Sequence, residues 1–302
     1  MTNDKHLPGH ATMLVTNIIF GLNLPISKML LDNDFISSYS LNFFRMIGGA
    51  ALFWIASLFV KHEKVPIKDI GLLFLASFFG VMFNQVTFLK GLGMTDPVEA
   101  SIVTTVVPIL TMIIAALYLR EPITWKKVIG VLIGAAGAII LILNTGEIGG
   151  GNSHMTGNLL CLLSGASYAT YLVVFRKLIG RYSPVTLMKW MFLFAAIGTT
   201  PLTWGDFRTI DFALFTWEIT AGVVFVVIGA TFLAYLLIPI GQRILRPTVV
   251  SMYNYLQPLV ASLVAIAIGL DGFTWEKGVA GILVFLGVYV VTLSKSRAQM
   301  EG

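Results

Sequence analysis

Long apolar runs alternate with short charged segments along the whole chain. Residues 100–119, 219–242 and 247–270 contain no Asp, Glu, Lys or Arg. A helix needs about 20 apolar residues to cross the hydrocarbon core of a bilayer, so each of these runs is long enough to do so. The pattern therefore predicts an all-α membrane protein.

Ten apolar runs, each bounded by charged or turn-forming residues, predict ten transmembrane helices. The first five lie near 11–31, 36–60, 69–89, 97–119 and 125–144, and the second five near 155–177, 184–204, 214–240, 247–270 and 275–294. The glycine-rich segment 145–154 between the two groups is typical of a flexible linker. We therefore expect two five-helix units, 1–144 and 155–302, joined by this linker.

Basic residues gather on one side of the predicted membrane. Of the 20 Lys and Arg residues, 14 fall in the two tails and in alternate loops, three fall in the other loops, and three lie within predicted helices. The positive-inside rule places the basic side, with both termini, in the cytoplasm, and the linker outside the inner membrane. Two termini on one side require an even number of spans, which agrees with ten.

The two halves of the chain repeat. Seven residues of the first half recur 150 positions later without a gap. They are Pro97, Ser101, Pro108, Thr124, Trp125, Lys127 and Gly137, which recur as Pro247, Ser251, Pro258, Thr274, Trp275, Lys277 and Gly287. Because each half has an odd number of spans, the second half is expected to insert upside down. Such an inverted repeat favours alternating access about a site at the midplane.

Composition supports this assignment. The chain is 57% hydrophobic and only 12% charged, whereas soluble domains carry about a quarter charged residues. The net charge of +5 lies in short clusters between apolar runs, without a basic face that could follow nucleic acid. The single cysteine, Cys161, excludes an intrachain disulfide. The polar N-terminus lacks a cleavage site, so we expect the first helix to be retained.

Several motifs resemble the drug/metabolite transporter superfamily, in particular proteins with two EamA-type units. They are Phe20-Gly21-Leu22-Asn23 with Lys28, Pro108, Arg120-Glu121-Pro122-Ile123-Thr124, and Gly130, Gly134 and Gly137, with weaker echoes at 168–176, Pro258 and Asp271-Gly272-Phe273-Thr274. The family often has Trp at the position of Phe20 and Glu at that of Asp271. The resemblance implies secondary transport of metabolites, often export of amino acids or related compounds, through a cavity lined by helices 1, 3, 4, 6, 8 and 9.

Polar side chains within a bilayer are costly, so by default they face a cavity or another helix. At 1.5 Å per residue, Asn23, Tyr168 and Gln257 lie close to the midplane. Tyr253, Asn254 and Gln257 have the spacing of one helix face, which favours a cavity over interhelical hydrogen bonding. The complete predicted lining is Asn23, Asn84, Gln85, Thr104, Tyr168, Tyr235, Tyr253, Asn254 and Gln257.

Three cations lie within predicted spans. Lys28 and Lys189 lie near helix ends, from which long basic side chains usually reach the interface. Arg45 lies deeper, and a partner is expected for it. A structural role is favoured for Arg45, with a gate or a substrate carboxylate as the alternative.

Acidic and imidazole groups are predicted to lie outside the membrane core. All 15 acidic residues fall in loops, tails or first helical turns, so no carboxylate stands within a span as a proton relay. Glu99 comes nearest, but Asp96-Pro97-Val98-Glu99 is typical of a capped helix start. All four histidines lie outside the predicted spans. No metal site or cofactor is therefore expected.

A transporter of a small molecule is the favoured function. A membrane-embedded enzyme is the alternative from another class, but the spans lack a convergent nucleophile, base or metal set. A channel is disfavoured because no charged ring or filter segment is present. Carriers of drugs or of nucleotide-linked metabolites stay open as alternatives.

Two prolines mark expected hinges. Pro108 and Pro258 each stand twelve residues beyond a loop marker, Asp96 or Arg246, and therefore about 18 Å along their helices. A proline removes a backbone hydrogen bond and kinks the helix. A static bend is the alternative. If the hinges are paired, alanine at the two positions should cause opposite changes in cysteine accessibility at the two mouths.

Overall fold

A computed structural model describes residues 6–32, 36–95, 100, 103–143, 155–267 and 273–294. All regular elements of these residues are helices. The first half contains α1 (Leu7–Leu31), α2 (Ser38–Ala56), α3 (Ile67–Ser77), η1 (Phe78–Met82), α4 (Phe83–Met94), α6 (Val107–Tyr118) and α7 (Trp125–Leu143). The second half contains α8 (Met155–Val174), α9 (Arg176–Arg181), α10 (Pro184–Phe207), η2 (Phe212–Leu214), α11 (Trp217–Val224), η3 (Phe225–Leu233), α12 (Ala234–Ile244), α13 (Pro247–Met252), η4 (Tyr253–Tyr255), α14 (Leu256–Ala267) and α15 (Trp275–Thr292).

The described helices have the length and hydropathy of membrane spans. Six are long and apolar enough to cross a bilayer, and α6 is a shorter apolar helix. The six are Leu7–Leu31, Ile67–Met94, Met155–Val174, Pro184–Phe207, Trp217–Ile244 and Trp275–Thr292. Each of the ten predicted ranges contains described helix. The all-helical class is therefore confirmed in these residues, and the count of ten spans stays a prediction.

Polar caps set several helix starts. Ser37 accepts a hydrogen bond from the backbone N–H of Ser40 before α2, and Ser183 caps α10, whose first residue is proline. Thr274 accepts from the N–H of Lys277 at the start of α15. Such caps satisfy N–H groups that have no partner within the helix. Helix 1 begins at Leu7, earlier than predicted, so His10 lies within α1 and not outside it.

Two helices contain long π-helical segments. Within the continuous helix Ile67–Met94, η1 covers residues 78–82, and within Trp217–Ile244, η3 covers residues 225–233. The two segments lie at corresponding places of the two halves. The sequence does not predict these π-helical segments. A π-helix has about one more residue per turn than an α-helix, and in a run that is apolar on every side this change leaves no sign in the pattern of apolar residues.

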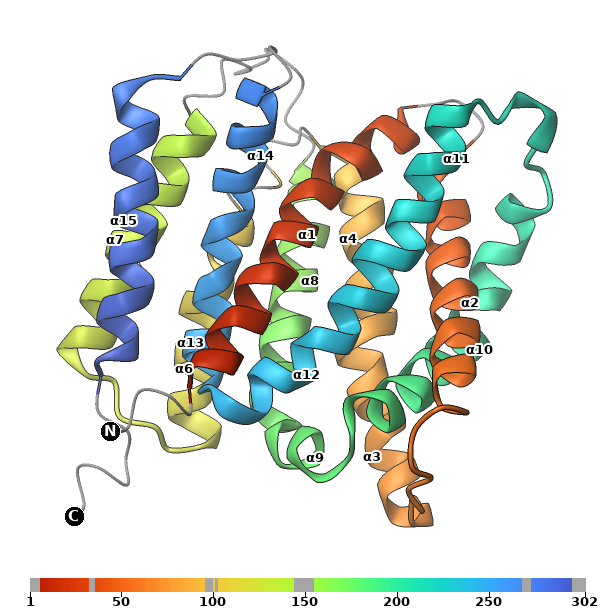
Figure 1. Cartoon of the computed structure of the whole chain (residues 1–302), viewed down its shortest axis with the longest axis horizontal. Helices are drawn as coiled ribbons and strands as arrows, with labels where there is room; N and C mark the ends of the chain where they lie inside the picture. Colours follow the sequence, from red (N-terminus) through yellow and green to blue (C-terminus); the bar gives the residue numbers. More distant parts are fainter. Residues whose placement is uncertain are drawn as a thin grey trace.

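Corresponding helices of the two halves run in opposite directions. In Figure 1, α1 rises from the bottom of the bundle, whereas α8 descends to α9, and α7 rises beside the descending α15. The first residue of α1 and the last residue of α15 both lie at the bottom of this view. We name this side of the bundle the termini end. The inverted arrangement expected from the odd number of spans per half is therefore seen directly.

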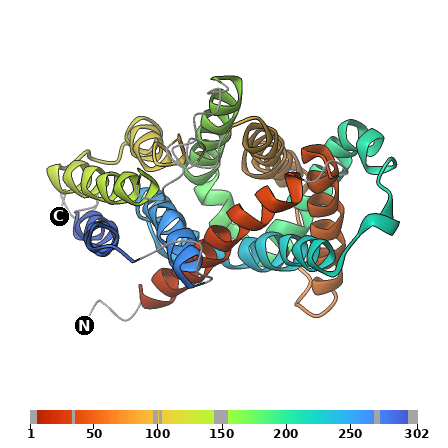
Figure 2. The same ribbon diagram turned by 90° about the horizontal axis from the view of Figure 1, so that it is seen from above.

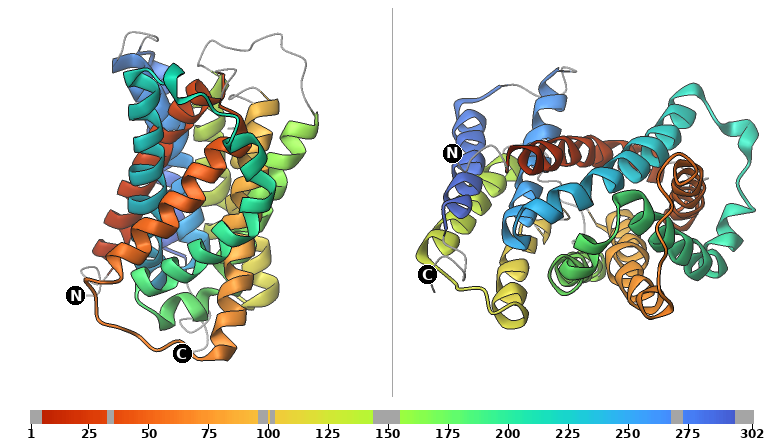
Figure 3. Two further views of the ribbon diagram at one scale, coloured as in Figure 1. Left: turned by 90° about the vertical axis from the view of Figure 1, so that its right-hand side faces the viewer. Right: turned by 60° about the horizontal axis from the view of Figure 1, so that its bottom comes forward.

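Packing joins one half to the other. The α7–α15 pair lies at one end of the elongated bundle and the α2–α10 pair at the other (Figures 2 and 3). Between them, α8 packs on α4 and α6, just as α1 packs on α12 and α14. Exchanging the two halves therefore reproduces the same set of neighbours.

Glycines allow α7 and α15 to approach closely. A Cβ added at Gly287 would lie 2.6 Å from the backbone nitrogen of Gly134 and 2.7 Å from the carbonyl oxygen of Gly130. Small residues commonly bring membrane helices this close. The glycine-rich character of helix 5 thus reflects a backbone-to-backbone seam, remote from the centre of the bundle.

Candidate functional site

A cavity of about 110 Å³ lies between the two halves. Its walls come from α1, α2, α4 and α6 of the first half and from α8, α12, η4 and α14 of the second. A cavity of this size holds several water molecules, because one water needs only about 10–15 Å³ by this measure. It can therefore receive a small solute.

Eight of the nine predicted lining residues meet at this cavity. They are Asn23, Asn84, Gln85, Thr104, Tyr168, Tyr235, Asn254 and Gln257. They come from six of the ten predicted spans. These polar residues, including the three predicted to lie near the midplane, are therefore brought together by the fold.

Tyr253 is the exception, because it does not line the cavity. Residues 253–255 form the 3₁₀-helix η4 and not an α-helix. The tighter winding of a 3₁₀-helix turns Tyr253 away from the face that Asn254 and Gln257 share. Its hydroxyl lies 2.6 Å from Nδ1 of His10. The single face predicted for all three residues is therefore wrong for Tyr253.

Hydrogen bonds join the two halves across the cavity wall. The side-chain amide of Asn84 donates to the carbonyl and hydroxyl oxygens of Ser164, at 3.0 and 2.9 Å, and Ser164 donates back to the carbonyl of Asn84. Gln85 donates from Nε2 to the hydroxyl of Tyr235. The Oε1 atom of Gln85 is buried and has no hydrogen-bond partner in the part of the chain that the structure describes.

The other amide side chains of the cavity wall differ in the hydrogen bonds that they make. Asn23 accepts a hydrogen bond from Ser27 at 3.2 Å, and Gln257 donates to Asn17 at 3.0 Å. The residue Asn254 lines the cavity, and its side chain makes no hydrogen bond with any described residue. Its amide is therefore the one most available to a solute among the described cavity amides.

Several lining residues were not predicted. They are Phe20, Leu24, Phe88, Val107, Cys161, Ser164, Gly165 and Ile238. Helix spacing was a usable signal for some of them, because Ser164 lies one turn before Tyr168, and Phe88 one turn after Asn84. Arg45, for which a structural role was favoured, also lines the cavity.

The other two cations within predicted spans lie away from the cavity. Lys28 forms an ion pair with Asp32 at 3.1 Å at the end of α1. Lys189 was expected to reach the interface, but its side chain is buried and its Nζ lies 5.1 Å from the ring centroid of Trp54. The ammonium group of Lys189 is therefore stabilised by a cation–π contact with Trp54 and not by water.

Each proline stands at a break in its helix. Residues 105–106 form a turn directly before α6, and Pro108 lies in the first turn of that helix. Pro258 lies in the first turn of α14, directly after η4. The irregular backbone beside both prolines agrees with the expected kinks, and the hinge role stays a prediction. Asp96, Glu99, Asp271 and the linker 145–154 lie outside the described residues.

Comparison with known proteins identifies the family. The model of the EamA-like transporter family matches residues 7–143 and 155–293. This chain belongs to the EamA-like transporter family. An uncharacterized transporter of Archaeoglobus fulgidus is 26% identical, over 84% of this chain and 91% of its own length. An uncharacterized transporter of Bacillus subtilis is 22% identical, over 97% of this chain and 89% of its own.

Two more distant similarities agree. A WAT1-related protein of Arabidopsis thaliana is 25% identical, over 92% of this chain and 80% of its own. A crystal structure with 18% identity superposes with a TM-score of 0.74 over 97% of this chain and 99% of that one, and so shares the fold. This EamA-like protein is therefore a multi-pass membrane transporter, whose substrate is a small molecule.

At the termini end of this EamA-like transporter, acidic residues of the first half form hydrogen bonds with the second half. Asp69 accepts hydrogen bonds from Arg181 and Tyr182. The carboxylate of Glu63 accepts from the backbone N–H of Ser183 at 3.0 Å and from its hydroxyl at 2.7 Å. These contacts join the loop before α3 and the first turn of α3 to the end of α9 and the two residues that follow it.

Hydrogen bonding lowers the pKa of Glu63. Burial alone would raise its pKa, but hydrogen bonds from Thr186 and Ser183 outweigh burial and lower the pKa. A lowered folded-state pKa means that the contact stabilises the fold at neutral pH, and that this contribution is lost as the pH falls through the lowered pKa.

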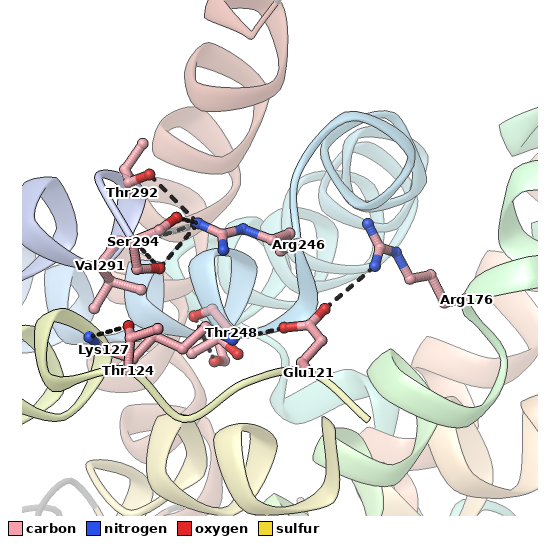
Figure 4. Close-up of polar contacts among 10 residues, drawn as sticks. Glu121, Thr124, Lys127, Arg176, Arg246, Thr248, Val291, Thr292 and Ser294 are labelled. Atoms are coloured by element: carbon pink, nitrogen blue, oxygen red, sulfur yellow. Dashed lines mark hydrogen bonds and ion pairs between the residues drawn. The ribbon is translucent and has the colours of Figure 1, made fainter. Parts of the chain in front are cut away.

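Glu121 forms a second bridge at the termini end. Figure 4 shows its two carboxylate oxygens directed to different cations. Oε2 lies 2.8 Å from Nζ of Lys127, and Oε1 lies 3.4 Å from Nη1 of Arg176 in the second half. Arg246 nearby donates from Nη2 to the carbonyl and hydroxyl oxygens of Ser294 at the end of α15. Both halves are therefore tied together at this end.

Proposed function

We propose that the protein is a ten-span secondary transporter that exports a small amphipathic metabolite, such as an amino acid, across the inner membrane by alternating access. The observation that carries this proposal is the central cavity, whose polar and apolar walls come equally from the two oppositely directed halves. Alternating access needs such a site between two units that rock against each other. The two matched segments support a division into 1–144 and 155–302 with a linker at 145–154.

We propose that the termini end faces the cytoplasm, because it carries most of the Lys and Arg residues. Single cysteines placed in the linker of a Cys161→Ala background should then react with impermeant maleimide added to whole cells. A cysteine placed at Ser183 is the control for the opposite side, and it should react only after lysis. The reverse pattern would invert the proposed orientation.

Exchange of labelled solute tests the transport function. We expect proteoliposomes loaded with unlabelled amino acid to accumulate the radiolabelled form by saturable counterflow, tested separately with each of the twenty amino acids. Asn254→Ala should reduce counterflow with little loss of stability, because the side chain of Asn254 has no hydrogen-bond partner among the described residues. Gln257→Ala should reduce it as well, with a stability loss of about 0.6 kcal/mol for one interhelical hydrogen bond.

Ser262→Ala is the matched control. Ser262 lies on α14 as Gln257 does, but it lines an outer groove and not the cavity. The rate of counterflow of the Ser262→Ala variant should equal that of the wild type. If Asn254→Ala and Gln257→Ala lose stability in proportion to transport, these residues hold helices together and do not contact solute. Absence of counterflow with all twenty amino acids would overturn the amino-acid proposal.

A further inference from the structure

Arg45 is a cation within the membrane-spanning part of the bundle. It lies seven residues into α2, about 10 Å along the helix. The residue is only 1% exposed, yet it belongs to the wall of the central cavity. Its small exposed surface therefore faces the cavity.

Protein contacts satisfy only part of the guanidinium group. Nε donates to the hydroxyl of Thr231 at 3.1 Å, and Nη2 donates to the carbonyl of Ala230 at 3.4 Å, both in η3. A guanidinium has five N–H donors. Three donors therefore have no acceptor among the described residues, and none of the ion pairs that those residues form involves Arg45.

An unpaired charge at such a place is expensive. Breaking a buried ion pair by removing one partner typically costs several kcal/mol, because the remaining charge is uncompensated. Charged residues within membrane spans for this reason pair with other groups or mark the path of a solute. The described cavity wall contains no carboxylate that could neutralise Arg45. The missing negative charge is one that a solute can bring.

We propose that Arg45 binds the carboxylate of the transported solute, which is a small monocarboxylate with an apolar body. This inference rests on the proposed transport function and specifies its substrate class. A guanidinium fork matches a carboxylate through two parallel hydrogen bonds, and such charge-assisted pairs are among the strongest in proteins. The apolar body would lie against Phe20, Leu24 and Phe88, which also line the cavity.

The cavity favours a carboxylate over a phosphate. Arg45 is the one cation in the described wall, and a single positive charge neutralises a carboxylate but only half of a phosphate dianion. The side-chain oxygens of Asn254 and Gln85 have no hydrogen-bond partner among the described residues, so they can accept hydrogen bonds from a donor group of the solute, such as a protonated amino group. An amino group is therefore accommodated, but the carboxylate is the group that the site requires.

Binding of matched aromatic probes tests the proposal. The probes are L-phenylalanine, 3-phenylpropanoate, which lacks the amino group, and L-phenylalaninamide, which lacks the carboxylate, together with inorganic phosphate. Affinities are measured by calorimetry on purified protein in lipid nanodiscs. The variants are Arg45→Gln and Arg45→Lys, and Lys189→Gln is the control because Lys189 is a buried cation outside the cavity.

We expect the wild type and Lys189→Gln to bind both carboxylates and to bind the amide at least about tenfold more weakly, as expected for loss of a charged hydrogen-bond partner. Arg45→Gln should lose this preference, and Arg45→Lys should retain part of it. Thermal unfolding shows which variants remain folded. If Arg45→Gln does not fold, the comparison of Arg45→Lys with Lys189→Gln decides, because lysine keeps the charge but loses the bidentate geometry.

Three results would overturn the inference. They are equal binding of the amide and the carboxylates by the wild type, an unchanged preference in the folded Arg45 variants, and tighter binding of phosphate than of 3-phenylpropanoate. Failure of the transport proposal is separate, since it would appear as carboxylate binding without counterflow of any solute that binds.

Discussion

Replacing Glu121 by glutamine should destabilise the protein by about 3 kcal/mol or more, because it leaves Lys127 as an unpaired buried charge. The side chains of Lys127 and Glu121 are only 2% and 10% exposed. Arg176→Gln removes the other partner of Glu121, but Arg176 is 35% exposed and its pair is weaker and screened by solvent. We expect Arg176→Gln to change stability by less than about 1 kcal/mol, measured by thermal unfolding in detergent.

A double variant separates charge from packing. Replacing a buried ion pair by apolar groups of similar volume is often neutral or stabilising. Glu121→Gln combined with Lys127→Met should therefore recover most of the stability that Glu121→Gln alone loses. Equal losses in Glu121→Gln and Arg176→Gln, or no recovery in the double variant, would show that the charge of Lys127 is not the cause.

Replacing Gly287 by alanine should separate α7 from α15 and cost about 3 kcal/mol, at the upper end of the usual overpacking penalty. The new Cβ would meet the backbone of Gly130 and Gly134 at 2.6–2.7 Å, and backbone atoms cannot move aside as a flexible side chain can. Unfolding in detergent measures the loss. Gly71→Ala in α3 is the control, since nothing lies within 4 Å of its Cβ.

The control should move in the opposite direction. Alanine is a better helix former than glycine, so Gly71→Ala is expected to stabilise α3 by up to about 1 kcal/mol. If Gly287→Ala is as stable as the wild type, the α7–α15 seam is more open than the structure has it.

Helix positions followed from the sequence because the signal, a long apolar run between charges, is the same property that makes a helix span a bilayer. The segments of irregular helix could not be predicted from the sequence. They are the π-helices at 78–82 and 225–233 and the 3₁₀-helix at 253–255, and in the first of them Gly80 lies directly against the ring of Tyr171 from another helix. No local pattern encodes these contacts.

The candidate site was predictable where a polar group interrupted an apolar run. Asn84, Gln85 and Gln257 were found for this reason. Apolar members of the wall, such as Phe20 and Phe88, look the same in sequence as residues that face lipid. Arg45 was noted as a cation within a span, but a structural role was favoured for it, because its lack of a counterion among the described residues is visible only once the neighbours of α2 are known. Tyr253 failed because its prediction assumed regular α-helical winding.

The pairing of helices across the halves has a consequence for biosynthesis. The most extensive contacts of α2, α4 and α7 are made with α10, α8 and α15, which are synthesised later. At about 5–20 residues per second, the ribosome needs roughly 10–30 s to add the second half. During that interval α2, α4 and α7 lie in the membrane without the helices that later cover them, and quality-control proteases can reach the incomplete chain. Assembly is thus a late event of translation, and a chain truncated after α7 would be degraded rather than stored as a folded half.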